Sequence, residues 1–134
     1  MTQTTQITNS VLIRGGYQAF NAADVDTLSR LFADDATWTT PGRSGVAGTA
    51  RGKEAVMAQF GRYGSETHGT FKANLIAIFE ADDGRVVGLH HNVGERNGKV
   101  LATDCCVVFE LEDGKVTAGT EYFFDLHDWD EFWS

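Results

Sequence analysis

The sequence is poor in basic residues and has no long apolar run. Only 11 of its 134 residues are lysine or arginine against 19 aspartates and glutamates, so the net charge is −8. Such a chain repels phosphate backbones and anionic membranes, which argues against nucleic-acid and membrane partners. No stretch approaches the roughly 20 apolar residues of a membrane span, and residues 1–6 lack the basic and apolar blocks of a signal peptide. We therefore expect a soluble, cytoplasmic protein.

Cysteine is equally scarce. Cys105 and Cys106 are neighbours, and adjacent side chains of a strand point to opposite faces, so they cannot form an ordinary disulfide. Two free thiols indicate a reducing compartment. The four histidines lack metal-site spacing, and His90 and His91 point oppositely in a strand, so we expect no metal. The glycines of residues 42–52 do not form a dinucleotide fingerprint, and we expect no cofactor.

The apolar content of 42% is enough for the core of one compact domain, and no repeat or linker divides residues 1–134. The first half of the chain has helical periodicity and helix signals. We predict a first helix over 5–21 and a second helix that Asp24 caps and that turns Leu28, Leu31 and Phe32 inward. A strand is predicted at 36–40, an irregular loop at 41–50, and a third helix over 52–63.

From residue 70 the apolar period changes to two. We predict strands over 71–79, 86–95, 101–111 and 116–124. They are joined by Asp83-Gly84, Asn97-Gly98 and Asp113-Gly114, dipeptides that type I′ turns prefer because both central residues need positive φ. The tail from His127 to Ser134 predicts one helical turn that packs three aromatic side chains on the body, namely Trp129, Phe132 and Trp133. The fold class is therefore α+β, with three helices covering one face of a curved antiparallel sheet and a pocket between the layers.

With the elements in this order, the Phe32-Ala33-Asp34-Asp35-Ala36-Thr37 segment resembles the nuclear-transport-factor-2-like superfamily, and within it the branch of ketosteroid isomerases and SnoaL-like cyclases. The resemblance implies a cone-like fold around an apolar pocket and a homodimer. It also implies a ligand such as a polyketide- or steroid-like ring compound. Because the superfamily hosts isomerases, cyclases, dehydratases and noncatalytic binding proteins, the fold alone does not assign an activity.

The catalytic positions of the isomerase are occupied differently here. In similar sequences a carboxylate base immediately precedes the proline, and this position is Thr40, whose hydroxyl is not a competent unaided base. The position of the oxyanion tyrosine is Gly16, with Tyr17 one place along and turned about 100° away on a helix. The position of the protonated aspartate is Val107. The resemblance therefore disfavours steroid isomerisation by that mechanism.

The Asn97-Gly98 turn predicts which strand residues share a face. A two-residue hairpin pairs Asn92 with Thr103, His90 with Cys105, and Gly88 with Val107. The resemblance makes this the concave face, so these side chains become pocket candidates. His91 and Asp104 then pair on the opposite face as a surface or interface ion pair of little energy.

Two registers remain open for the last strand. Counting straight from the Asp113-Gly114 turn points Thr120 and Tyr122 inward. A bulge at Gly119, which we favour, points Glu121 and Phe123 inward instead.

A carboxylate and an imidazole in an apolar cavity can act as a general acid–base pair, because burial raises the pKa of the carboxyl and the neighbouring charge shifts the pKa values of both groups. We therefore hypothesise a cofactor-free isomerase, cyclase or dehydratase. In this enzyme Glu121 or His90 moves a proton. An oxygen atom of the ligand is positioned by Tyr17, Thr40 or Asn92. The other predicted ligand contacts are Trp38, Phe60, Thr103, Cys105, Val107 and Phe123.

Less specific interpretations stay open beside it. Glu121 and His90 can be satisfied polar groups of the core, and the domain can be a noncatalytic ligand carrier or sensing module. It can also be a structural dimerisation domain whose aromatic side chains fill the cavity. A nucleophilic Cys105 is disfavoured because apolar neighbours raise the pKa of a thiol.

Overall fold

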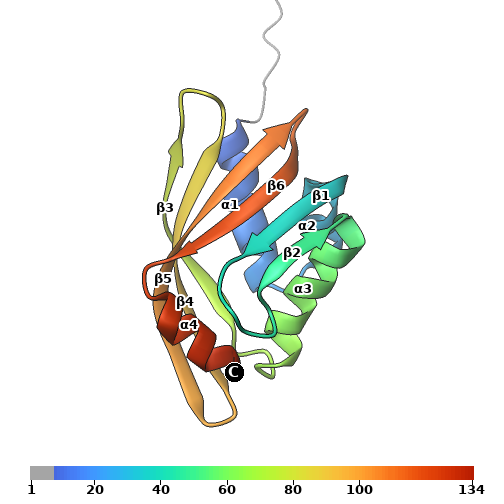
Figure 1. The fold of residues 1–134 in the computed structure, drawn as a ribbon. Helices are drawn as coiled ribbons and strands as arrows, with labels where there is room; N and C mark the ends of the chain where they lie inside the picture. Colours follow the sequence, from blue (N-terminus) through green and yellow to red (C-terminus); the bar gives the residue numbers. More distant parts are fainter. Residues whose placement is uncertain (1–7) are drawn as a thin grey trace, which may run out of the picture.

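The computed structural model describes residues 8–134, which form a bent six-stranded sheet and four helices (Figure 1). The sheet order is β2-β1-β6-β5-β4-β3. The elements are α1 (Asn9–Asn21), α2 (Val25–Leu31), β1 (Phe32–Thr40), β2 (Gly48–Arg51), α3 (Lys53–Ser65), β3 (Lys72–Glu80), β4 (Val86–Arg96), β5 (Lys99–Glu112), β6 (Lys115–Phe123) and α4 (Leu126–Trp133). The predicted α+β class is confirmed.

The first two helices begin where side chains accept hydrogen bonds from free backbone N–H groups. Thr8 caps α1 by accepting from the Val11 N–H, and Asp24 caps α2, as predicted, by accepting from the Thr27 N–H. Residues 5–7 of the predicted first helix lie outside the described residues. None of the helices within 8–134 is long and apolar enough to cross a membrane.

The sheet contains pairings that the sequence did not predict. The predicted loop 41–50 includes the start of β2, which pairs with β1 in antiparallel fashion from Thr40↔Gly48 to Thr37↔Arg51. Phe32, predicted on a helix, is the first residue of β1. β1 also runs parallel to β6, with Trp38 beside Gly119. The sheet is therefore an antiparallel meander extended by one parallel pair.

Two of the three predicted type I′ turns are confirmed. Both residues of Asn97-Gly98 and of Asp113-Gly114 have positive φ. The prediction for Asp83-Gly84 is wrong, because only Gly84 of that pair has positive φ. This connection is a longer loop in which the Asp83 side chain accepts from the backbone N–H of Arg85 at 3.1 Å.

The bulge in β6 lies at Thr117 and not, as predicted, at Gly119. Leu111 pairs with Val116 but Glu110 pairs with Ala118, so Thr117 is the extra residue. Its hydroxyl donates to the Glu110 carbonyl at 3.2 Å. The consequence for the register is the predicted one, because Glu121 pairs with Val107 and turns inward.

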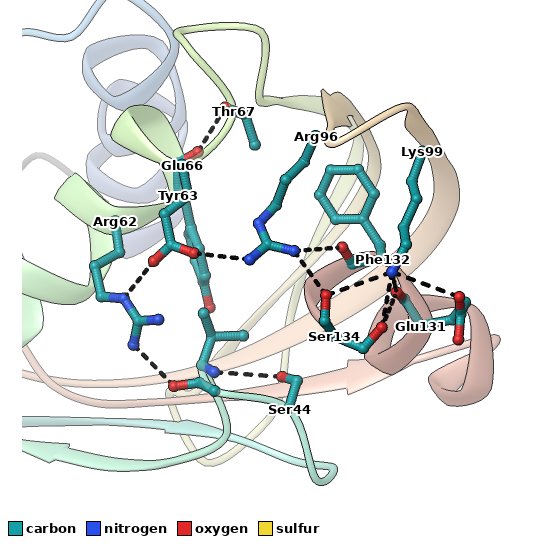
Figure 2. Close-up of polar contacts among 12 residues, drawn as sticks. Ser44, Arg62, Tyr63, Glu66, Thr67, Arg96, Lys99, Glu131, Phe132 and Ser134 are labelled. Carbon is teal, nitrogen blue, oxygen red and sulfur yellow. Dashed lines mark hydrogen bonds and ion pairs between the residues drawn. The ribbon is translucent and has the colours of Figure 1, made fainter.

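The core has two parts. The larger lies between the helices and the sheet, and the smaller gathers at α4, which buries Trp129, Phe132 and Trp133 as predicted. Basic side chains of the β4–β5 hairpin hold this helix in place (Figure 2). Arg96 donates to the Phe132 carbonyl at 3.1 Å and Lys99 to the Glu131 carbonyl at 2.7 Å. These bonds tie the end of α4 to the β4–β5 hairpin.

Candidate functional site

A narrow cavity lies between the helices and the concave face of the sheet. Its wall is almost entirely apolar and aromatic, and its polar side chains come from α1, α3, β4 and β6. The lining residues are Ile13, Gly16, Tyr17, Phe20, Leu28, Leu31, Phe32, Trp38, Phe60, Tyr63, Phe71, Ala73, His90, Asn92, Val107, Phe109, Glu121 and Trp129.

The size of the cavity limits what it holds. The centres of water-sized spheres can occupy about 60 Å³ of it. One water needs about 10–15 Å³ by this measure, so the space corresponds to a handful of waters. Aromatic side chains fill part of the interior, as the structural-domain hypothesis expects, but they leave this space open.

Glu121 is the acidic group of the cavity. The residue is 4% exposed, and its Oε1 atom accepts hydrogen bonds from Trp38 Nε1 at 2.5 Å and from the Tyr63 hydroxyl at 3.0 Å. Burial raises the pKa of this carboxyl to about 7, although the hydrogen bonds from Trp38 and Tyr63 oppose the rise. Since both bonds go to Oε1, neither Trp38 nor Tyr63 occupies Oε2.

Tyr63 is a site residue that sequence reasoning missed. Its hydroxyl accepts from Gln59 Nε2 at 3.2 Å, which directs its own proton to Glu121, and Thr40 Oγ1 lies 3.3 Å from it. Burial raises the pKa of Tyr63, so it stays a neutral donor. A signal was present, because Val56, Phe60 and Tyr63 recur at the i, i+4, i+7 spacing of one helix face.

His90 belongs to a second polar group. Its Nδ1 atom lies 2.7 Å from the Tyr17 hydroxyl. Burial lowers the pKa of His90 to about 4, against the neighbouring Asn92 side chain, which raises it, and burial raises the pKa of Tyr17. Both are therefore neutral at pH 7, and the tautomer of the imidazole decides whether Tyr17 or Nδ1 donates. Glu121 is hydrogen-bonded by Trp38 and Tyr63, whereas His90 pairs with Tyr17.

Seven of the eleven predicted site residues line the cavity, namely Tyr17, Trp38, Phe60, His90, Asn92, Val107 and Glu121. The other four lie behind this wall. Thr40 contacts Tyr63, Phe123 stacks on Trp129 with centroids 4.0 Å apart, and Thr103 and Cys105 are buried in β5. Burial raises the pKa of Cys105, which keeps it a thiol. Within residues 8–134, no cluster of three histidine, cysteine or acidic side chains is arranged to hold a metal.

The opposite face of the sheet carries the predicted pair of His91 and Asp104. Their Nδ1 and Oδ1 atoms are 2.7 Å apart, and both side chains are 39% exposed. Large apolar side chains lie exposed on the outer strands and strand ends, including Ile76 on β3 and Tyr122 on β6.

The model of the SnoaL-like domain family matches residues 13–119 of this chain. Among solved structures, Bal32a from a soil-derived mobile gene cassette is 55% identical, with a TM-score of 0.93 over 94% of this chain and 96% of that one. An uncharacterized protein of Mycobacterium tuberculosis is 28% identical over 92% of this chain and 94% of its own length.

More distant structures share the fold. TerC, co-crystallised with polyporic acid, is 21% identical with a TM-score of 0.78 over 92% of this chain and 96% of that one. A protein from Cytophaga hutchinsonii described as NTF2-like is 22% identical with a TM-score of 0.71, over 92% of this chain and 96% of that one.

Proposed function

This chain belongs to the SnoaL-like domain family, within the nuclear-transport-factor-2-like superfamily, and from that premise we propose that it is a cofactor-free enzyme. It takes a compact apolar ring compound into the cavity and moves a proton with Glu121. The reaction class is isomerisation, cyclisation or dehydration.

The observation that carries the proposal is the buried carboxyl of Glu121. A carboxylate in water has a pKa near 4 and is a weak base, whereas a pKa near the working pH suits a group that takes and returns a proton. The pKa of Glu121 lies at about 7 because of burial. Trp38 and Tyr63 donate to its Oε1, and Thr40 also lowers the pKa of the carboxyl, so the group is held in one orientation, and the proposed proton transfer uses Oε2.

This arrangement differs from the isomerase of the same superfamily. Thr40 stands where the base is expected and Val107 where a protonated aspartate is expected. Here the carboxylate comes from β6 and lies beside Val107 in the sheet. The proposed proton-transfer group therefore lies on β6, whereas the resemblance expects the base of the isomerase at the end of β1.

The dimensions of the cavity favour a ligand of one or two rings. A larger polyketide- or steroid-like compound requires the aromatic wall to move. Phe20 and Phe60 also line a second, outer hollow formed with α2 and Lys72, so their displacement joins the two spaces. The fold neighbour TerC, co-crystallised with polyporic acid, supports small-molecule binding on this scaffold.

Isomerisation of 3-cyclohexenone to 2-cyclohexenone tests proton transfer with a small probe. Glu121 takes the proton at C2, the electron pair moves onto the oxygen as a dienolate, and the same proton returns to C4. We expect the wild type to accelerate the reaction and Glu121→Gln to lose about 10²- to 10⁴-fold. Glu110→Gln, an exposed change on β5, serves as the matched control and is expected to keep the wild-type rate.

A noncatalytic ligand carrier is the second candidate, supported by the same apolar lining. Binding is followed separately by thermal shift, because a ligand that binds the folded state raises its stability. A probe that binds the wild type without turnover, and binds Glu121→Gln equally well, overturns the catalytic proposal and favours the carrier.

The outer sheet face supports a homodimer. Its exposed apolar side chains, among them Ile76 and Tyr122, lie on the same side of the sheet as the His91–Asp104 pair. A second copy of this chain covers them with an equivalent surface, as closed two-fold symmetry requires. The two free cysteines support a location in the reducing cytoplasm.

A further inference from the structure

Asn92 carries a buried hydrogen-bond donor that none of residues 8–134 uses. The residue lines the cavity and is 1% exposed, yet its Nδ2 atom has no hydrogen-bond partner within the described chain. A buried polar group left unpaired costs about 1–3 kcal/mol. A purely structural role for this asparagine is therefore unfavourable, and an acceptor on a bound molecule removes the cost.

A second polar pair adjoins this amide. The Tyr17 hydroxyl lies 2.7 Å from His90 Nδ1, and the tautomer of the ring decides which of the two donates. Asn92 follows two residues later on the same face of β4 and raises the pKa of the ring. If Tyr17 donates, the ring proton is on Nε2, and the ring then offers no free acceptor to the N–H group of Asn92.

Groups within the protein do not satisfy this N–H. Asn92 also faces the thiol of Cys105, but sulfur is a weak acceptor and the geometry leaves Nδ2 without a bond. The Cys105 thiol instead contacts the Cys106 carbonyl at 3.5 Å. Glu121 pairs in register with Val107, which pairs with Gly88, four residues before Asn92 on β4. The amide and the carboxylate are thus separate ends of one site.

We propose that Nδ2 of Asn92 donates a hydrogen bond to the carbonyl oxygen of a ring compound, so that the cavity selects ring ketones over hydrocarbons of the same shape. The inference rests on the proposed function only in that the cavity takes a ring ligand. It is independent of proton transfer by Glu121. A hydrocarbon leaves the amide unpaired, and a site built to hydrogen-bond its ligand rejects such an analogue.

Acetophenone and α-methylstyrene form a matched pair of probes, because they differ only in C=O against C=CH₂. We expect the wild type to bind acetophenone about tenfold more tightly in NMR titrations. Asn92→Leu, which keeps the approximate volume without the donor, binds the two compounds equally. A wild type without preference, or a preference that survives in Asn92→Leu, overturns the proposal.

Chemical denaturation distinguishes a ligand-directed asparagine from a structural one. Asn92→Leu is expected to be at least as stable as the wild type, because it removes an unpaired polar atom. Thr67→Val is the contrast, since the Thr67 hydroxyl donates to the Tyr63 carbonyl at 2.7 Å and accepts from the Phe71 N–H at 3.1 Å. It loses stability and retains the ketone preference. An Asn92→Leu protein as destabilised as Thr67→Val contradicts the proposal.

The tautomer of His90 is measurable in the wild type without any variant. Long-range ¹H–¹⁵N NMR is expected to show the Nε2–H form, and the Nδ1–H form, whose free Nε2 can accept from Asn92, overturns the proposal. If neither probe binds the wild type, both this inference and the proposed function fail. If both bind equally while Glu121 still transfers protons, only this inference fails.

Discussion

Trp38 packs directly on Gly119. The two residues are paired where β1 runs parallel to β6, and a Cβ atom on Gly119 would overlap the six-membered ring of the indole. This close approach lets the Trp38 Nε1 atom reach Glu121 Oε1, two residues further along β6, at 2.5 Å. The glycine is thus part of the geometry that orients the carboxyl.

Gly119→Ala is expected to displace the indole and break its hydrogen bond to Glu121. Overpacking of this kind lowers the free energy of unfolding by about 1–3 kcal/mol. Chemical denaturation measures the loss, and tryptophan fluorescence reports the changed environment of Trp38. Gly15→Ala in α1 is the matched control, because a Cβ atom there meets nothing within 4 Å. It is expected to raise the free energy of unfolding by about 0.5–1 kcal/mol. Wild-type stability and fluorescence in Gly119→Ala would contradict the packing.

The pH dependence of stability is expected to reflect two opposing groups. The pKa of Glu121 is raised from 4.5 to about 7. Its contribution to the free energy of unfolding is therefore fully present below pH 4.5 and is lost as the pH rises through 7. The pKa of His90 is lowered from 6.5 to about 4, so stability recovers as pH rises from 4 to 6.5. The two slopes cancel between about pH 4.5 and 6.5, and the decline toward pH 7 remains.

Glu121→Gln removes one of the two slopes. We expect its free energy of unfolding to rise by about 3 kcal/mol between pH 4 and 6.5 and then to stay level, because the lowered pKa of His90 is then no longer opposed by Glu121. Urea denaturation across this range measures the curve. Parallel curves for wild type and variant would show that Glu121 titrates normally.

Tyr63→Phe is expected to raise the pKa of Glu121 further. The Tyr63 hydroxyl stabilises the ionised carboxylate, and a hydrogen bond to a charged group contributes about 1.5–3 kcal/mol, or about one to two pH units. Titration of the Glu121 carboxyl by ¹³C NMR measures the change. Tyr122→Phe removes an exposed hydroxyl on the same strand as Glu121 and should leave the titration unchanged. A downward shift in Tyr63→Phe would be inconsistent with Tyr63 as the donor.

Tyr122→Glu tests the proposed dimer. Tyr122 is 56% exposed on the outer sheet face, and a carboxylate there places like charges across a two-fold interface. We expect sedimentation to show a dimer for the wild type and a monomer for the variant. Val11→Glu is the control, because Val11 is similarly exposed, at 58%, on α1. A dimer that survives Tyr122→Glu places the contact elsewhere.

Local signals account for what was predictable. Both residues of the Asn97-Gly98 and Asp113-Gly114 turns have positive φ, and the first of these turns sets the pairing of His90 with Cys105 over the whole β4–β5 hairpin. Asp24 caps α2 because its side chain reaches an N–H only three residues away. Such interactions depend on neighbours in the chain, which is why sequence patterns reveal them.

The candidate site could be predicted only in part from such local interactions. The inward turn of Glu121 followed from a bulge that was placed two residues too late, because a lone glycine in a strand indicates either a bulge or a close packing partner. Here Gly119 accommodates Trp38 and Thr117 is the bulged residue. Tyr63 was overlooked because its partner Glu121 lies 58 residues away.

By itself, the sequence determined the helices, the meander, the register of its central hairpin and the set of concave-face candidates, because caps, turns and apolar periods act over a few residues. The tertiary structure decided that β1 runs parallel to β6, that Trp38 and Tyr63 hold Glu121, and that His90 pairs with Tyr17 instead. These contacts join residues up to 84 positions apart, as in the pairing of Phe32 with Val116. They form only when packing brings the layers together, which no local pattern encodes.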